Sequence, residues 1–259
     1  MQLSAACALL GQLRFVIQTA FLPTAWAVLW SPSIILRPSA ISRLFMSHVW
    51  AIMGDGMDEN GREAKEELIT EHAYGVVVDI GAGHGHAVNY LNRSRVTKYV
   101  AVEPNVHMHD KIRHIAHAAG YDESSKSLTI LSCGAEDLTE ILSTLGERHS
   151  ADVIISVRAM CSVPSPEKTI RALADEVLKP GGQFLFFEHV LSARADVAWW
   201  QRFWTPLWLL AFDGCHLDRP THLWVEAVGG WREQKVWGLP DEGEEHLFWH
   251  RLGRFVKAP

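Results

Sequence analysis

The residues with the clearest chemical potential are three glycines spaced two apart, Gly81, Gly83 and Gly85, which directly follow a strongly apolar, β-branched run. A strand that enters such a turn lets the backbone approach a nucleoside cofactor closely, because glycine carries no side chain. A dinucleotide fingerprint needs a third glycine three residues after the second. That position is His86 or Val88, depending on the register. The spacing therefore does not fit NAD or FAD.

A carboxylate follows the next apolar run. Residues 99–102 predict a second strand, which ends at Glu103, 18 residues beyond Gly85. A carboxylate there can accept hydrogen bonds from both hydroxyls of a ribose. The alternative for Glu103 is a solvated acid at a strand end. A second acid, Asp79, stands two residues before the first glycine.

Three further strands must position the remaining polar groups. Residues 128–131 lead to Ala135, Glu136 and Asp137, where the acids could contact a base or serve the dipole of a helix start. Residues 152–157 predict a fourth strand, which ends at Val157 and is followed by Arg158. Residues 183–187, after a turn at 178–182, predict a fifth strand. Ligands bind at the carboxyl ends of strands in open α/β sheets.

These elements, in this order, resemble the class I S-adenosylmethionine-dependent methyltransferases over residues 70–195. The resemblance implies an α/β three-layer sandwich with a mostly parallel, seven-stranded, Rossmann-like sheet, plus N-terminal apolar helices. Residues 235–237 and 247–252 would form its antiparallel edge hairpin. It also implies S-adenosylmethionine as the cofactor, bound by Asp79, Gly81, Ala82, Gly83, Gly85, Glu103, Pro104, Asn105, Ala135, Glu136, Val157 and Arg158.

Composition narrows the class of acceptor. The chain has 259 residues, 48% of them hydrophobic, and a net charge of −6. A nucleic-acid enzyme needs a basic face for phosphates, so we expect a small-molecule acceptor and no nucleic acid. The four cysteines form no C-x-x-C pair, which favours a reduced, intracellular protein over a disulfide framework.

The N-terminal segment 1–50 differs from the methyltransferase domain expected over 51–259. Residues 15–36 are uncharged, about the length that crosses a bilayer, but Pro23 and Pro32 interrupt them. The pattern predicts a broken apolar hairpin in a membrane interface, anchored by Trp26 and Trp30. Residues 1–36 would then contact the endoplasmic reticulum or another membrane on its cytoplasmic face. Helices that cover the cofactor site are the alternative. The following stretch, 47–73, should be helical with a hinge at 53–56, near the cofactor's methionine end.

An aromatic insert at 193–220 bears on the acceptor. Trp200, Trp204 and Trp208 recur every four residues and would share one helix face. Thr205 suits a helix N-cap and Pro206 a first helical position, so we expect two short helices joined by a kink. The aromatic face is either core or the wall of an acceptor pocket.

A narrower resemblance adds the residues 160–163, 187–190, Trp204, Trp208 and 212–217. Together they resemble the membrane-associated methyltransferase-like alkyl thiol S-methyltransferases, and related fungal methyltransferases that tailor secondary metabolites. The resemblance implies thiol S-methylation of an apolar acceptor, with N- or O-methylation as the alternative. Its implied acceptor pocket contains Cys161, Trp204, Trp208, Asp213 and His216. The chain departs from the family in Asp79, where Glu is usual, and in its interrupted anchor.

Methyl transfer needs an unprotonated nucleophile aligned with the donor carbon. His189, at the end of strand five, is the expected catalytic base, with Asp213 and His216 as second choices and a structural histidine as the alternative. The pairs His84/His86 and His107/His109 have no third ligand at a predictable spacing, so we expect no metal. A cofactor-binding partner protein without catalysis remains the alternative to an enzyme.

Overall fold

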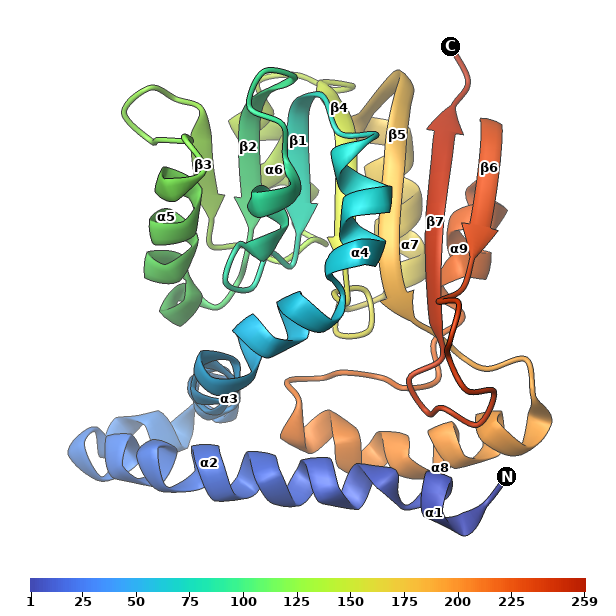
Figure 1. The fold of residues 1–259 in the computed structure, drawn as a ribbon. Coiled ribbons are helices and arrows are strands. Elements are labelled where there is room, and N and C mark those ends of the chain that lie inside the picture. The colour runs from blue at the N-terminus through green and yellow to red at the C-terminus, as the bar shows by residue number, and fades with distance from the viewer.

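Seven strands form one sheet in the order β3-β2-β1-β4-β5-β7-β6 in the computed structural model, which describes residues 1–259 (Figure 1). Strands β1 to β5 pair in parallel, and β7 runs antiparallel to both β5 and β6. The expected mostly parallel, seven-stranded sheet is confirmed. Its strands are β1 (Gly75–Ile80), β2 (Val96–Val102), β3 (Leu128–Leu131), β4 (Ala151–Val157), β5 (Leu178–His189), β6 (Trp231–Trp237) and β7 (His250–Lys257).

The sheet is buried on both faces, which explains the unbroken apolar run of β1. Val77 packs with α5 (His109–Ala118) and the short helices η2 (Glu66–Thr70) and η3 (His86–Tyr90). Val78, its neighbour, points to the opposite core. There the sheet meets the helices α6 (Leu138–Leu145), α7 (Pro166–Ala172), η5 (Leu173–Val177) and α9 (Thr221–Val228). The fold is therefore a three-layer sandwich.

The crevice follows from the strand order. The chain places β2 and β3 on one side of β1, and β4 and β5 on the other. Parallel strands that diverge in this way leave a crevice at their carboxyl ends, where ligands bind. Helix α3 (Pro38–Asn60) crosses that end of the sheet, followed by α4 (Arg62–Lys65) (Figure 1).

A third core joins the N-terminal helices to the aromatic insert. Helices α1 (Leu3–Ala6) and α2 (Ala8–Trp30) lie alongside α8 (Ala195–Ala211), below the carboxyl ends of the strands (Figure 1). Leu9, Leu13 and Val16 are buried in this contact. The apolar N-terminal helices are thus confirmed. The expected domain limit at residue 50 falls inside α3, which continues across it without a break.

The expected chain breaks at proline and glycine were mostly wrong. Helix α2 continues through Pro23, and the turn of the apolar hairpin falls at 31–37, where Pro32 begins the short helix η1 (Pro32–Leu36). Helix α8 likewise continues through Pro206. Thr205 does not cap a helix, because its hydroxyl donates to the Gln201 carbonyl at 2.8 Å. Packing against neighbouring helices outweighs the one backbone hydrogen bond that each proline removes.

The expected hinge at 53–56 does not interrupt the helix, because α3 is helical throughout that stretch. Gly54 instead allows a close approach. A Cβ atom there would lie 3.0 Å from the Trp50 ring and 3.1 Å from His84 Nδ1, so a side chain would require these two rings to shift by a few tenths of an ångström. Gly54 therefore allows α3 to pack closely against the glycine turn.

The remaining differences between the predicted and the observed elements concern where strands begin. The turn expected at 178–182 belongs to β5, because Leu178 pairs with Ala151 and Lys179 Nζ binds Asp152 Oδ1 at 2.7 Å. Strand β6 begins at Trp231 rather than at 235, and β7 begins at His250 rather than at 247. Leu247 and Phe248 are apolar for another reason, since they pack into the third core.

Candidate active site

The glycine turn presents bare backbone to the crevice. Gly81, Gly83 and Gly85 all have positive φ angles, of 63°, 56° and 82°. A Cβ on Gly81 would lie 2.5 Å from Ala159 Cβ, and one on Gly85 would lie 3.2 Å from Ile112 Cα. A Cβ on Gly83 would meet no atom within 4 Å. The outer glycines therefore serve packing, whereas Gly83 keeps space open in the crevice.

Glu103 is held against this turn by backbone donors. Its Oε2 accepts from Gly83 N at 2.8 Å, and its Oε1 accepts from Asn105 N at 2.8 Å. The residue is 7% exposed, and burial raises the pKa of its carboxyl to about 7 despite these two hydrogen bonds. Each oxygen keeps further acceptor capacity. The carboxylate is thus fixed in position with lone pairs left for two hydroxyl donors.

Asp79 lies beneath the turn. It is 2% exposed, and its Oδ2 accepts from the Tyr99 hydroxyl at 2.6 Å. Burial raises the pKa of the Asp79 carboxyl to about 7. Asp79 reaches the crevice but is tied to β2 by Tyr99, a contact that the spacing of the motif did not reveal.

The crevice has a cavity volume of about 70 Å³ and opens to solvent. Six of the predicted cofactor residues line it: Asp79, Gly81, Ala82, Gly83, Val157 and Arg158. Nine further residues form the other wall of the crevice, and the sequence did not predict a cofactor role for any of them. They are Trp50, Gly54, Met57, Asp58, Lys65, His84, His86, Ala87 and Phe187. Most of these come from α3 and η3. For α3, the sequence contained one indication of this position, namely the expectation that residues 47–73 lie near the cofactor's methionine end.

Lys65 and His86 of this wall are each paired with an acid, whereas the buried Nδ1 of His84 has no hydrogen-bond partner. Lys65 Nζ forms an ion pair with Asp58, and its Nζ lies 4.6 Å from the centre of the Tyr90 ring. His86 Nε2 contacts Asp55 Oδ1 at 2.9 Å. His84 is 7% exposed, and burial lowers its pKa to about 4, which keeps its imidazole neutral. The wall therefore adds little net charge to the crevice.

Arg158 differs from Lys65 in this wall, because no carboxylate forms an ion pair with it. Its backbone is held at a φ of 54°, its guanidinium stacks 4.9 Å from the Phe187 ring centre, and its buried Nε has no partner. Glu188 Oε1 fixes the turn around it by accepting from Ser156 Oγ at 2.6 Å and from Ala159 N at 3.0 Å. The positive φ and the unpaired buried donor make Arg158 a candidate to bind a ligand with an acceptor group.

The other predicted cofactor residues, Glu103 and Gly85 among them, do not line the crevice. Asn105 Nδ2 donates to the Arg43 carbonyl at 2.8 Å, which ties the loop after β2 to α3, and Pro104 stands between it and Glu103. Ala135 is buried and Glu136 is exposed. Asp137 caps α6 by accepting from Glu140 N at 3.2 Å. Asp137 therefore serves the start of helix α6, which was the alternative to contact with a base.

Beyond the crevice, His189 ends β5 among aromatic and sulfur groups. It is 4% exposed, and its Nε2 lies 3.4 Å from Cys215 Sγ, while its buried Nδ1 has no partner. Its ring meets Phe248 edge-on at 5.4 Å. Trp208 stacks on Phe212 at 3.8 Å and also packs on Phe248. Cys161, Trp208 and Cys215 belong to the same buried core.

The predicted acceptor residues divide into two groups. Cys161 and Trp208 lie with His189, whereas Trp204 faces the N-terminal helices and donates from Nε1 to the Ala6 carbonyl at 2.7 Å. Asp213 Oδ1 accepts from Ser42 Oγ on α3 at 2.7 Å. His216 Nδ1 lies 3.5 Å from Asp218 Oδ1, and burial lowers its pKa. The second-choice bases are therefore engaged elsewhere.

Comparisons with known proteins agree with this arrangement. A family model described as "Methyltransferase domain" matches residues 56–227. The rat thiol S-methyltransferase TMT1B is 37% identical over 109 residues, which cover 42% of this chain but only 44% of the rat protein. Human thiol S-methyltransferase TMT1B is 24% identical over 187 residues, 70% of this chain and 73% of that protein.

Solved structures share the fold at low identity. An O-methyltransferase family protein from Burkholderia thailandensis superposes with a TM-score of 0.63 at 14% identity. The superposition covers 95% of this chain and 70% of that one. Such identity establishes the fold and carries no information on the acceptor.

Proposed function

Because this chain belongs to the methyltransferase-domain family, we propose that it transfers a methyl group to the sulfur of a small, apolar thiol. Family and fold make it a class I methyltransferase with S-adenosylmethionine as cofactor. The choice of a thiol is the finer proposal. It is supported by the thiol S-methyltransferases of rat and human among its relatives and by the apolar, sulfur-lined surroundings of His189.

We propose that residues in and directly beside the crevice hold the cofactor part by part. Gly83 leaves the open space that the nucleoside needs, and Glu103 offers a fixed carboxylate for the ribose hydroxyls. Arg158 supplies the unpaired guanidinium that a carboxylate of the amino-acid end would satisfy. When bound, S-adenosylmethionine supplies a methyl group activated by a sulfonium centre. The residues of the chain hold and orient it, and they exclude water.

The acceptor side is the neighbourhood of His189. Phe187 lines the cofactor crevice, and His189 follows two residues later on the same face of β5. A thiol must be ionised to act as a nucleophile, and His189 is the catalytic residue proposed to make that ionisation favourable. Its contact with Cys215 Sγ carries this proposal, because it places the imidazole within reach of a sulfur atom among aromatic walls.

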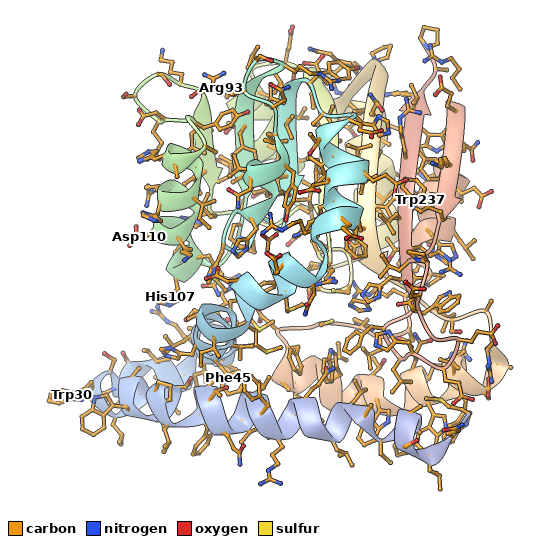
Figure 2. The ribbon with its side chains drawn as sticks, viewed as in Figure 1. Trp30, Phe45, Arg93, His107, Asp110 and Trp237 are labelled. Carbon is orange, nitrogen blue, oxygen red and sulfur yellow. The ribbon has the colours of Figure 1, made fainter.

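A membrane surface is the proposed source of an apolar acceptor. Leu3–Trp30 is long and apolar enough to span a bilayer by length and composition, and 28% of that window is buried. Its outer side exposes Phe21, Leu22, Trp26, Leu29 and Trp30. The neighbouring α8 exposes Trp199, Phe203, Leu207 and Leu210. Figure 2 shows Trp30 at the far tip of α2, away from the sheet.

The distribution of charged residues also favours contact between the N-terminal helices and a membrane surface. Residues 1–54 contain no Asp or Glu, whereas Arg14 and Arg37 are exposed. Apolar groups flanked by arginine favour an anionic lipid interface. Because α8 covers one side of α2, we propose that both helices lie in the interface and that α2 does not span it. The cytoplasmic face of an intracellular membrane is the proposed location.

The experiment that tests this function is methyl transfer from labelled S-adenosylmethionine to a panel of alkyl thiols, amines and phenols. We expect thiols to be turned over and His189→Gln to lower kcat at neutral pH, with unchanged affinity for S-adenosylhomocysteine. His114→Gln, an exposed histidine on α5, is the control and should change neither quantity. Turnover of amines or phenols alone would instead indicate an N- or O-methyltransferase of secondary metabolism. Cofactor binding without any turnover would indicate a non-catalytic partner protein.

A further inference from the structure

Three metal-binding side chains meet at the acceptor end of the crevice. Cys161 comes from the turn after β4, His189 from the end of β5, and Cys215 from the loop after α8. Their ligand atoms all lie within 4.8 Å of one another. The residues are 2%, 4% and 8% exposed. Nothing in their spacing along the chain predicted this meeting, which is a product of the fold.

From this geometry, and resting on the proposed function, we propose that Cys161, His189 and Cys215 bind a zinc ion that takes the acceptor sulfur as its fourth ligand. Cys and His are the usual zinc ligands in proteins, and three protein ligands with one open position are typical of catalytic zinc. His189 then acts on the thiol as a metal ligand.

The observed distance fits this ion. Zn–S bonds of about 2.3 Å and Zn–N bonds of about 2.0–2.1 Å, in a tetrahedron, hold sulfur and nitrogen about 3.5 Å apart. Cys215 Sγ and His189 Nε2 are 3.4 Å apart in this structure. The ring of His189 is oriented by this contact and by the edge-on packing of Phe248. Little rearrangement of these two ligands is needed.

Charge balance explains why the site can be buried. Cys161 and Cys215 are both buried in an apolar core, so two thiolates there need a compensating cation. Two thiolates and a neutral imidazole make a Zn²⁺ complex with no net charge, which is the least costly form in an apolar core. Binding of an acceptor thiolate adds one negative charge. Arg219 lies beside the cluster, because its Nη1 donates to the Met160 carbonyl at 2.7 Å and the Val163 carbonyl at 2.8 Å.

The site also borders the cofactor. Cys161 Sγ lies 3.5 Å from the carbonyl oxygen of Arg158, which lines the crevice. An acceptor thiol that reaches the ion loses its S–H bond, its sulfur bonds to zinc, and the proton passes to water. Metal coordination lowers the pKa of a thiol enough to keep it ionised at neutral pH. The chain thereby provides a thiolate without a dedicated base.

Metal content of the purified full-length protein tests the proposal. We expect one zinc per chain in the wild type, and in Cys7→Ser, which removes an exposed cysteine. Cys161→Ser and Cys215→Ser should each weaken zinc binding at least about tenfold. Binding of S-adenosylhomocysteine by these variants shows that they are folded. Co²⁺ in place of zinc should give thiolate-to-metal charge-transfer absorption that both variants lose.

The outcomes separate this proposal from the proposed function. Thiol turnover that is lost with a chelator and restored by Zn²⁺ would support both. Turnover that persists in metal-free protein would overturn the zinc site and leave the thiol methyltransferase intact. Zinc bound through the two cysteines, with no thiol methylated, would overturn the acceptor assignment and not the metal site. Zinc content unchanged in both serine variants would place the metal elsewhere and contradict the proposal.

Discussion

Glu103 and Gly83, twenty residues apart in the sequence, are joined by a 2.8 Å hydrogen bond from the Gly83 N–H to the carboxylate. The bond couples the strand-end acid to the one glycine of the turn that faces open space. A nucleoside would therefore meet a preformed carboxylate and a preformed bare turn at once. We propose this pairing as the structural basis for the cofactor site.

The first prediction concerns the carboxylate. Glu103→Ala should weaken binding of S-adenosylhomocysteine by about 1–3 kcal/mol, the effect of losing one buried hydrogen-bonding partner. Isothermal titration calorimetry measures this change directly. Glu147→Ala, an exposed acid after α6, should leave the affinity unchanged. Wild-type affinity in Glu103→Ala would remove Glu103 from the ribose.

The second prediction separates backbone strain from loss of space. Gly83 and Gly146 both have positive φ angles, and neither Cβ would meet an atom within 4 Å. Alanine at either position should cost about 1–2 kcal/mol of folding stability. Only Gly83→Ala should also weaken cofactor binding, by about tenfold or more, because only its Cβ enters the crevice. Equal affinities in the two variants would show that Gly83 does not face the cofactor.

The third prediction follows from the buried carboxyl of Asp79. Its pKa of about 7 lies above the ordinary value of 3.8, so the folded protein holds this proton more tightly than the unfolded chain. Stability contributed by the protonated form is present below about pH 4 and is lost as pH rises through about 7. Asp79→Asn should match the wild type near pH 4 and exceed it near pH 8, by on the order of 2–4 kcal/mol.

Urea denaturation at several pH values measures this difference. Buried histidines such as His84, whose pKa is lowered to about 4, make the folded protein more stable as pH rises. They are present in both the wild type and Asp79→Asn, so their contribution largely cancels in the stability difference. A stability difference that stays constant from pH 4 to pH 8 would mean that the Asp79 carboxyl does not titrate in this range.

The fourth prediction concerns the apolar surface of α2. Trp26→Ser should reduce co-flotation with vesicles of phosphatidylcholine and phosphatidylserine about tenfold, because a buried aromatic side chain contributes on the order of 1.5–3 kcal/mol. Leu223→Ser, which removes a half-exposed apolar side chain from α9, should bind vesicles as the wild type does. Equal loss in both variants, or no binding by the wild type, would contradict an interface role for α2.

Most of the strands and the glycine turn were predictable because local sequence carries them, whereas the seven-stranded sheet was implied by the family resemblance. The β-branched run of β1 requires burial on both faces, and Gly81, Gly83 and Gly85 occur together in one turn with positive φ. The position of Glu103 beside this turn was predictable for the same reason, as it directly follows a strand. The order of such elements determines where their carboxyl ends meet.

What could not be predicted depends on contacts between distant segments. Helix α8 passes through Pro206 because Trp204 and Trp208 anchor it against the N-terminal helices and the third core. Gly54 marks a close approach to His84 and not a hinge. The meeting of Cys161 with Cys215 requires a strand end and a loop after α8 to converge. No spacing rule reports such convergence.

A structure of the protein with S-adenosylhomocysteine tests the central claim most directly. We predict that both ribose hydroxyls donate to Glu103, that the nucleoside lies over Gly83, and that the ligand's carboxylate meets Arg158. The ligand sulfur should point toward His189. A ligand bound outside this crevice, or a ribose without contact to Glu103, would contradict the account.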